Sequence, residues 1–201
     1  VSSIYEDGSS DDQFFENIGL SFPYPKSVNV SKFLLRNVLN NANIILDFFA
    51  GSGTTLHAIM ELNEEDNGKR QCVLVQAPEK TYEIKNGKKK ALKGTEKLLK
   101  KGIAHLSDLT YLRNKAVIEG YSTKKENVAG LGNSLKYYRT AFVGKNNPKD
   151  ATDEDKVTLS KKAGCLLALA ENTLYEQKST DFYQIYSDEK GHTTAIYFQE
   201  D

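Results

Sequence analysis

The sequence predicts an α/β fold built on a parallel sheet, followed by a smaller α+β region. Two short apolar runs, 44–49 and 72–75, are typical of strands that are buried on both faces of such a sheet. A glycine-rich turn and a helical pattern lie between them, and strand, turn, helix and strand together form the crossover unit of parallel sheets. The pattern changes after about residue 125, which predicts the appended region.

Each part of the chain carries its own local signal. Residues 1–21 are polar and acidic and predict a loop or linker, residues 22–125 predict the α/β portion, and residues 126–201 predict the small α+β region. The expected elements are a helix at about 30–39, a helix at about 103–118, a strand at 135–143, a turn at 146–149, a helix that begins with a capping box at Thr152–Asp155, and a hairpin with strands 182–186 and 194–198.

Composition narrows the class of protein. The 27 basic and 27 acidic residues cancel, which argues against nucleic-acid binding driven by overall charge. No apolar run is long enough to cross a bilayer, and the first residues do not form a secretion signal, so a cytoplasmic location is expected. Cys72 and Cys165 lie in apolar runs and are expected to be buried free thiols. No zinc-type spacing occurs, so no metal site is predicted.

The glycine turn does not fit either of the common phosphate-binding patterns. A P-loop requires a Lys after its last glycine, whereas Thr54 and Thr55 follow Gly53 here. A dinucleotide fingerprint requires a third glycine where this chain has Leu56. An acid, Asp47, ends the strand, and a buried acid without a polar partner is unfavourable, so a turn used only for tight packing is the weaker interpretation.

The turn resembles motif I of the amino methyltransferases that act on DNA. The resemblance is carried by Asp47-Phe48-Phe49-Ala50-Gly51-Ser52-Gly53-Thr54-Thr55 and implies a Rossmann-like sheet, here partial, that binds S-adenosylmethionine. It implies that Asp47 binds the amino group of the cofactor and that N–H groups of the turn bind its carboxylate. Either Gly51→Val or Gly53→Val is then expected to abolish cofactor binding and to leave the fold largely intact.

Two further segments carry the same resemblance. Phe22-Pro23-Tyr24-Pro25-Lys26-Ser27 is similar to motif X, with Ser27 in place of a final proline, and implies that Phe22, Pro25 and Lys26 cover the cofactor. An acid after the second strand binds ribose hydroxyls in nucleotide-type sites, and Glu79 is assigned this role, with Gln76, which lies nearer the strand, as the second candidate. His57, within the following helix, is expected to serve packing.

Taken together, residues 22–79 resemble the modification (Mod) subunit of Type III restriction-modification systems. The resemblance implies an adenine-specific DNA methyltransferase whose partners are double-stranded DNA, a second Mod subunit and a restriction (Res) subunit. The catalytic tetrad of that family, of the Asp-Pro-Pro-Tyr type, is absent from this sequence, because no two of the four prolines are adjacent. No catalytic residue is therefore assigned. The chain is expected to be an inactive, cofactor-binding piece of a longer protein with an incomplete sheet.

Other interpretations stay open at this point. A non-catalytic DNA-holding or assembly module would keep the fold without the chemistry, and a dehydrogenase or kinase is disfavoured by the glycine pattern. The lysine-rich stretch 85–101 is either a solvated helix face, which is the default, or a contact with DNA phosphates.

Overall fold

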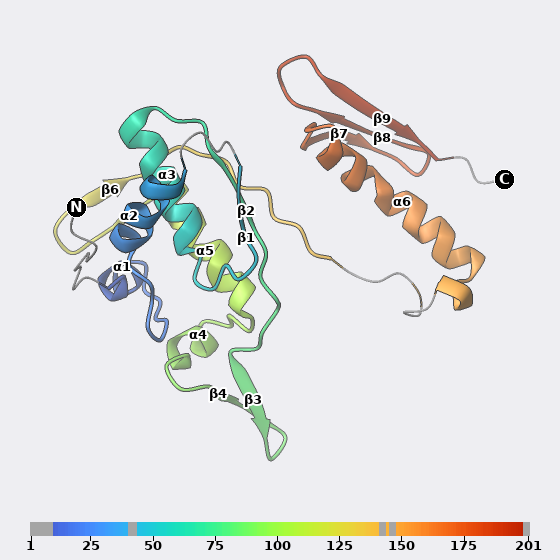
Figure 1. The fold of residues 1–201 in the computed structure, drawn as a ribbon. Helices are drawn as coiled ribbons and strands as arrows, with labels where there is room; N and C mark the ends of the chain where they lie inside the picture. The colour runs from blue at the N-terminus through green and yellow to red at the C-terminus, as the bar shows by residue number, and fades with distance from the viewer. Residues whose placement is uncertain (1–9, 40–43, 141–143, 145–147, 199–201) are drawn as a thin grey trace. The chain divides into compact units, whose positions relative to one another are not determined.

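The computed structural model describes residues 10–39, 44–140, 144 and 148–198, which form two compact units (Figure 1). The first unit is Val1–Leu135 and the second is Lys136–Asp201. The division therefore lies ten residues beyond the expected one at 125/126. The reason is that Leu131 and Leu135 pack against the core of the first unit, and the Leu131 N–H donates to the Val117 carbonyl at 3.0 Å.

The first unit is a mixed α/β structure. In chain order its elements are α1 (Asp12–Asn17), α2 (Val28–Val38), β1 (Ile44–Asp47), α3 (Thr54–Asp66), β2 (Gln71–Leu74), β3 (Tyr82–Lys85), β4 (Lys88–Ala91), α4 (Glu96–Lys100), α5 (Leu106–Glu119), β5 (Gly120–Ser122) and β6 (Asn127–Ala129). Its core is one cluster of buried apolar side chains: Phe14, Phe15, Leu20, Leu56, Met60, Leu98, Ile103, Leu109 and Val117.

Helix α1 lies where the sequence predicted a loop or linker, and that prediction is wrong for the residues described there. Phe14 and Phe15 are 8% and 1% exposed, and their rings meet edge to face with centroids 5.5 Å apart. Leu20, after a turn at Gly19, is buried beside them. Burial of three large apolar side chains outweighs the loop-forming tendency of the Ser, Gly and Asp residues around them.

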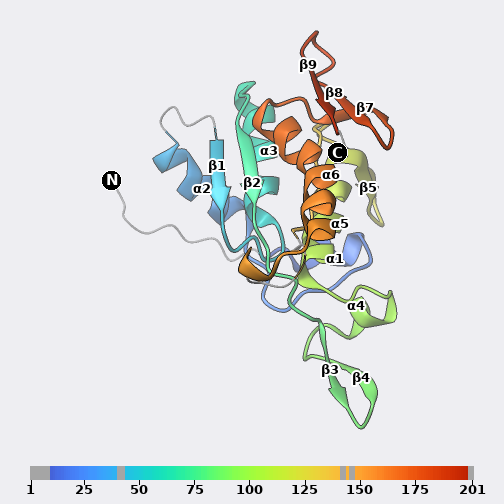
Figure 2. The ribbon, with the colours of Figure 1, turned by 90° about the vertical axis from the view of Figure 1, so that its right-hand side faces the viewer.

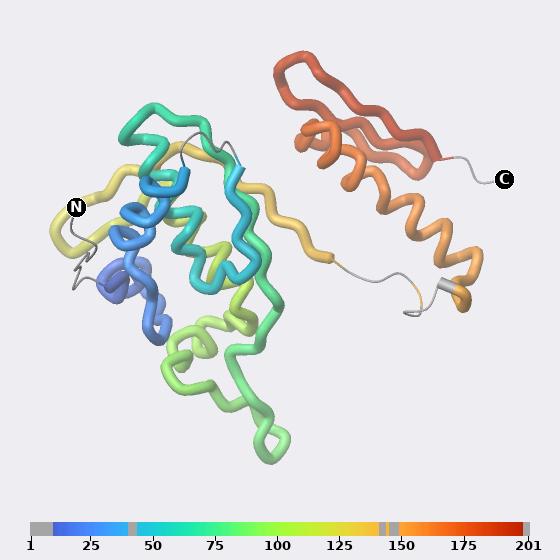
Figure 3. The backbone as a smooth tube through the Cα atoms, viewed as in Figure 1, coloured from blue at the N-terminus to red at the C-terminus, as the bar shows by residue number. Residues whose placement is uncertain are grey.

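The predicted crossover unit is confirmed in its order and direction. Strands β1 and β2 pair in parallel, from Ile44 opposite Gln71 to Asp47 opposite Leu74, and α3 connects them. Helix α2 lies alongside α3 (Figure 3). A salt bridge of 2.7 Å between Lys32 Nζ and Glu61 Oε2 joins these two helices.

The described residues cover only one face of the two-stranded sheet, which corrects the expectation of burial on both faces. Cys72 and Leu74 pack against the core that α3 contributes to. On the opposite face Leu46 and Val73 are paired in register and are 50% and 49% exposed. Val75, which follows β2, is likewise exposed, so this face presents apolar side chains.

The stretch 85–101 does not form the solvated helix face that was the default interpretation. Strands β3 and β4 form an antiparallel hairpin that projects from the first unit (Figures 1 and 2). Asn86 and Gly87, with φ of 51° and 71°, make its two-residue turn, as Asn-Gly pairs do in hairpins. Only the short α4 is helical in this stretch, and its Leu98 is fully buried.

The second unit is a helix on a three-stranded antiparallel sheet. Its elements are η1 (Pro148–Asp150), α6 (Asp153–Ala170), β7 (Tyr175–Ser179), β8 (Tyr183–Ser187) and β9 (Thr193–Tyr197). The predicted capping box is confirmed, since Thr152 and Asp155 exchange side-chain and backbone hydrogen bonds. The predicted hairpin is confirmed as β8 and β9, and β7 is an additional strand.

Part of the prediction for this unit is wrong. Residues 135–140 do not form the expected strand, residues 141–143 lie outside the described residues, and Pro148 begins a short 3-10 helix in the predicted turn. Both cysteines are free, as expected, but Cys72 and Cys165 are half-buried rather than buried. No helix in the described part of the chain is long and apolar enough to cross a membrane.

Candidate functional site

The carboxylate of Asp47 closes the glycine turn at the end of β1. Its Oδ1 accepts the Phe49 N–H at 2.9 Å, and its Oδ2 accepts the Thr55 hydroxyl at 2.6 Å. These two bonds connect the end of the strand to the first turn of α3. An ionised carboxylate has about four acceptor positions, so Asp47 keeps capacity for a further donor.

Gln76, at the end of β2, is part of the same turn. Its Oε1 accepts the Gly51 N–H at 2.7 Å, and the Val75 carbonyl accepts the Ala50 N–H at 3.1 Å. The Gln76 amide therefore orients the turn. The resemblance implied that the N–H groups of the turn are available to the cofactor carboxylate, but two of them are already hydrogen-bonded. The Gly51 N–H donates to Gln76, and the Gly53 N–H donates to the Ala50 carbonyl at 2.7 Å.

Glu79, the other candidate for the ribose hydroxyls, is placed differently. Its side chain is exposed, and its backbone carbonyl accepts the Leu106 N–H at 2.8 Å. That bond connects the segment after β2 to the start of α5. The structure thus brings Gln76 directly onto the glycine turn, whereas Glu79 contacts the turn through no hydrogen bond between described residues.

The two glycines of the turn have different surroundings. Both have positive φ, 54° at Gly51 and 82° at Gly53, which favours glycine. A Cβ at Gly53 would lie 2.3 Å from Asn114 Nδ2 and 3.2 Å from the Thr110 carbonyl oxygen. A Cβ at Gly51 would meet only the Phe49 carbonyl oxygen, at 3.7 Å. Gly53 is therefore required by packing beneath the turn, and Gly51 borders open space.

This difference corrects one expectation. A larger side chain at Gly53 must displace buried groups of α5, so Gly53→Val is not expected to leave the fold intact. Only Gly51 fits the idea of a substitution that fills the ligand's space without disturbing the interior.

Helix α5 forms a polar floor under the turn, which the sequence reasoning missed. The Thr110 hydroxyl donates to the Gly51 carbonyl at 2.6 Å. Arg113 Nη1 donates to Thr54 Oγ1 at 2.9 Å and to Ser52 Oγ at 3.3 Å. The only local signal was a set of polar residues, including Arg113 and Asn114, inside an apolar helical pattern. Nothing local shows that their partners lie about sixty residues earlier.

Arg113 is fully buried and also holds the N-terminal segment in place. Its Nη2 contacts Asp11 Oδ2 in a salt bridge, and its guanidinium lies 5.0 Å and 5.3 Å from the ring centroids of Phe14 and Phe15. Burial lowers the pKa of Arg113 from its ordinary value, and Asp11 acts in the opposite direction. An arginine nevertheless stays protonated in proteins, so a buried positive charge lies directly beneath the turn.

His57 belongs to this network. Its Nδ1 lies 3.1 Å from Arg113 Nη2, and its Nε2 lies 3.0 Å from Glu61 Oε1. Because a guanidinium only donates, Nδ1 accepts and Nε2–H donates to Glu61. Burial raises the pKa of Glu61, but hydrogen bonds from His57 and Lys32 outweigh it and lower that pKa to about 2. The contacts of His57 are structural, in line with the packing expected for it.

The two aromatic residues of the turn are exposed. Phe48 is 62% exposed and Phe49 is 90% exposed. Thr54 is buried on the floor, and Thr55 is half-buried beside Asp47. The turn therefore combines a polar, tightly bonded interior with an apolar, open exterior.

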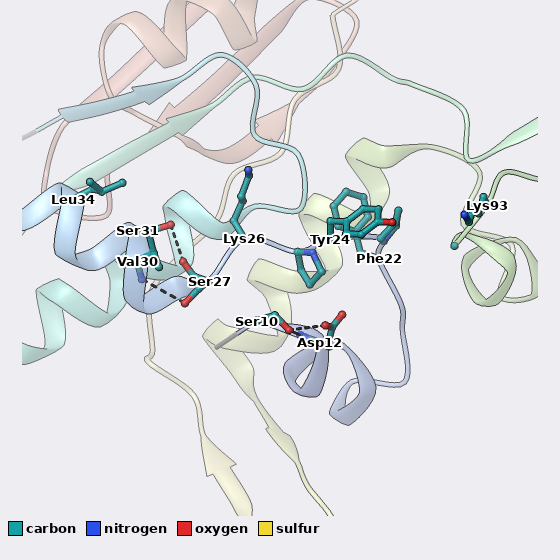
Figure 4. A pocket seen from close by; sticks show the side chains of 13 residues that line it. Ser10, Asp12, Phe22, Tyr24, Lys26, Ser27, Val30, Ser31, Leu34 and Lys93 are labelled. Carbon is teal, nitrogen blue, oxygen red and sulfur yellow. Dashed lines mark hydrogen bonds between the residues drawn. The ribbon is translucent and has the colours of Figure 1, made fainter. Parts of the chain in front are cut away.

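The segment predicted to cover the cofactor lines a separate groove (Figure 4). The groove has a volume of about 940 Å³, and its lining includes Phe22, Pro25, Lys26, Lys93 and Gly94. Pro25 is buried and Lys26 is exposed. None of the turn residues from Asp47 to Thr55 lines this groove. Hydrogen bonds thus join Asp47, the turn and Gln76 into one constellation, and between described residues no hydrogen bond connects Phe22, Pro25 or Lys26 to it.

Comparison with known proteins finds similarity to DNA methyltransferases over the part of the chain that contains the turn. Residues 3–87 match the DNA methylase family. The StyLTI Mod subunit, from a Type III restriction-modification enzyme of Salmonella typhimurium, is 44% identical over 63 residues. The matched stretch is 31% of this chain and 9% of that protein. Over the matched residues the chain is similar to Type III Mod subunits. The resemblance read from the sequence is thereby confirmed.

Other relatives extend the similarity beyond the turn. The EcoPI Mod subunit of Escherichia phage P1 is 31% identical over 111 residues, 55% of this chain and 16% of that protein. The Type II methyltransferase M.KpnI of Klebsiella pneumoniae is 33% identical over 100 residues, 50% of this chain and 21% of its own length. The chain thus spans a small part of the length of these Mod subunits and of M.KpnI.

Proposed function

We propose that this chain is the S-adenosylmethionine-binding part of an adenine-specific DNA methyltransferase of a Type III restriction-modification system. The observation that carries the proposal is the constellation of Asp47, the Gly51–Thr55 turn and Gln76 at the carboxyl ends of two parallel strands. Ligands of α/β proteins bind at that edge of the sheet. The match of residues 3–87 to the DNA methylase family supports the choice of ligand.

The residues present fit this cofactor. Asp47 keeps acceptor capacity for an amino group, and the first N–H groups of α3 follow the turn and favour a carboxylate. Gly51 borders open space, so a ligand can approach the backbone there. The exposed rings of Phe48 and Phe49 provide apolar surface for the adenine. When bound, the cofactor supplies a methyl group on a positively charged sulfur.

The side chains of the turn have distinct tasks in this proposal. Asp47 binds and orients the amino end of the ligand. Gln76 and Thr110 hold the Gly51 backbone in its open conformation, through bonds of 2.7 Å and 2.6 Å. Arg113 keeps the floor rigid and electropositive below Thr54. No group of this chain is proposed to act on the target base, because the chain has no adjacent prolines and so lacks the tetrad.

The open face of the β1–β2 pair supports a larger sheet. We infer that the pair belongs to a Rossmann-like sheet in the full protein, because Leu46, Val73 and Val75 form an apolar surface that a complete sheet would cover. The partners proposed for that protein are double-stranded DNA, a second Mod subunit and a Res subunit.

A calorimetric titration tests the proposal. The chain is titrated with S-adenosylmethionine, ATP and NAD in separate experiments, and binding of the first alone is expected. Asp47→Asn keeps the size of the side chain and is expected to weaken binding by about tenfold, since one charge-assisted hydrogen bond contributes about 1.5 kcal/mol or more. Asp66→Asn, which neutralises a carboxylate at the far end of α3 from the turn, is the matched control. Binding of ATP or NAD, or of no ligand by the chain and by the full protein, would favour a nucleotide enzyme or a non-catalytic DNA-holding module instead.

A further inference from the structure

The β3–β4 hairpin concentrates positive charge in a chain whose charges otherwise cancel. Residues 80–93 contain six lysines and one glutamate, a local net charge of +5, whereas the whole chain has a net charge of zero. Every one of these lysines is exposed. The hairpin therefore differs from an ordinary solvated surface, on which both signs alternate.

Within the described part of the chain, the lysines of β4 form no salt bridge with a carboxylate. Glu83 forms a salt bridge of 2.9 Å with Lys85, which is on its own strand. Among the residues that the structure describes, Lys88, Lys89 and Lys90 form no salt bridge, and Lys89 lies 4.6 Å from the ring centroid of Tyr82. Three cations are thus available to external anions, Lys88 and Lys90 on one face of the hairpin and Lys89 on the other.

The pairing of the strands places one pair of like charges opposite one another near the turn, whereas Glu83 lies opposite Lys90 farther from it. Lys85 and Lys88 are direct cross-strand partners beside the Asn86–Gly87 turn. Like charges in that position destabilise a hairpin, so the fold gains no stability from this arrangement. A polyanion bound along the hairpin would remove the repulsion.

The base of the hairpin is anchored firmly. The hydroxyl of buried Thr81 donates to the Ile103 carbonyl at 2.8 Å, and the hydroxyl of buried Thr95 donates to the Thr81 carbonyl at 2.6 Å. The Leu92 N–H also donates to the Thr81 carbonyl at 3.0 Å. The lysines are therefore presented from a rigid support, which reduces the entropy lost on binding.

We propose that the β3–β4 hairpin contacts the phosphate backbone of double-stranded DNA, and that Lys88, Lys89 and Lys90 neutralise its phosphates. The inference rests on the proposed function, which supplies DNA as the substrate. Such contacts give affinity without sequence information. DNA is favoured over an anionic membrane because the projecting part of the hairpin, residues 82–91, has a single large exposed apolar side chain, Ile84, too little for insertion into lipid.

The test compares two variants of the full-length protein that carries this chain. One is Lys88→Gln, Lys89→Gln and Lys90→Gln together. The control is Lys124→Gln with Lys125→Gln, two exposed lysines beside the β5–β6 hairpin of the same unit. Binding to a short DNA duplex of unrelated sequence is measured by fluorescence anisotropy at several salt concentrations, and circular dichroism verifies that both variants are folded.

The hairpin variant is expected to lose about tenfold or more in affinity at low salt. The slope of log K against log salt should fall by about 3, since each phosphate contact contributes about 0.9. The control variant should keep the parental slope. An unchanged slope in the hairpin variant, an equal loss in the control, or loss of binding to vesicles with an anionic lipid while DNA binding persists would each overturn the proposal.

The result is separable from that of the proposed function. S-adenosylmethionine affinity is measured on the same proteins and should be equal in the parent and both variants. If no protein binds the cofactor, the proposed function fails while the DNA slopes still decide the hairpin. If all three proteins bind the cofactor and the salt slope of the hairpin variant equals that of the parent, only the hairpin inference fails.

Discussion

Substituting each glycine of the turn by alanine tests whether Gly53 packs against the interior while Gly51 faces open space. At Gly53, with φ of 82°, an L-residue in the left-handed region costs roughly 1–2 kcal/mol. The added Cβ would lie 2.3 Å from Asn114 Nδ2, which itself donates to the Thr110 carbonyl at 2.8 Å. Displacing that buried amide costs a further 1–3 kcal/mol or so. Gly53→Ala is therefore expected to lower the free energy of unfolding by about 2–5 kcal/mol.

Gly51→Ala is the matched comparison, because its φ is also positive but its Cβ would make only an ordinary contact at 3.7 Å. Its expected cost is the backbone term alone, about 1–2 kcal/mol. Gly51→Ala should nevertheless reduce cofactor affinity more than Gly53→Ala does, because only Gly51 borders the space proposed for the ligand.

Urea denaturation followed by far-ultraviolet circular dichroism measures both stabilities. A third variant, Gly53→Ala with Asn114→Ala, removes the displaced amide and should be more stable than the sum of the two single effects implies. Equal destabilisation by Gly53→Ala and Gly51→Ala, or strict additivity in the double variant, would refute the assignment of α5 as the floor of the turn.

Three further predictions concern the interior of the first unit. Arg113→Met should lower the free energy of unfolding by about 3–5 kcal/mol, because it leaves the largely buried carboxylate of Asp11 without its ion-pair partner. A decrease in melting temperature smaller than that caused by substituting an exposed lysine would contradict this. Glu61 has a folded-state pKa of about 2, below the ordinary 4.5, so its ion pairs stabilise the fold above about pH 4.5 and this contribution is lost as the pH falls toward 2. Glu61→Gln should accordingly reduce the melting temperature at neutral pH and flatten its decline in acid, and an unchanged decline would contradict the network. Burial, with a smaller effect of Asp47, raises the pKa of the Cys72 thiol to about 12. In a Cys165→Ser variant, iodoacetamide at about pH 8 should label the denatured chain and spare the folded one, and rapid labelling of the folded chain would count against this burial.

Local patterns were sufficient to predict several elements. The apolar run 44–49, the glycines after it and the helical spacing beyond them predicted β1, the turn and α3, because each signal lies within a few residues of the structure it specifies. The same holds for the capping box at Thr152 and for the hairpin of β8 and β9. The Asn86–Gly87 pair was a local hairpin signal as well, but the surrounding lysines led to a helical interpretation.

By itself, then, the sequence determined the strand–turn–helix–strand unit and its kinship with DNA methylases, since these depend on the order of residues along the chain. Only the tertiary structure decided that α1 is a buried helix, that Gln76 holds the turn, and that Arg113 and Asn114 support it from α5. The physical reason is that burial and buried hydrogen bonds depend on which distant segments meet. The partners of Arg113 lie 59 residues away at Thr54 and 102 residues away at Asp11, and no local pattern joins them.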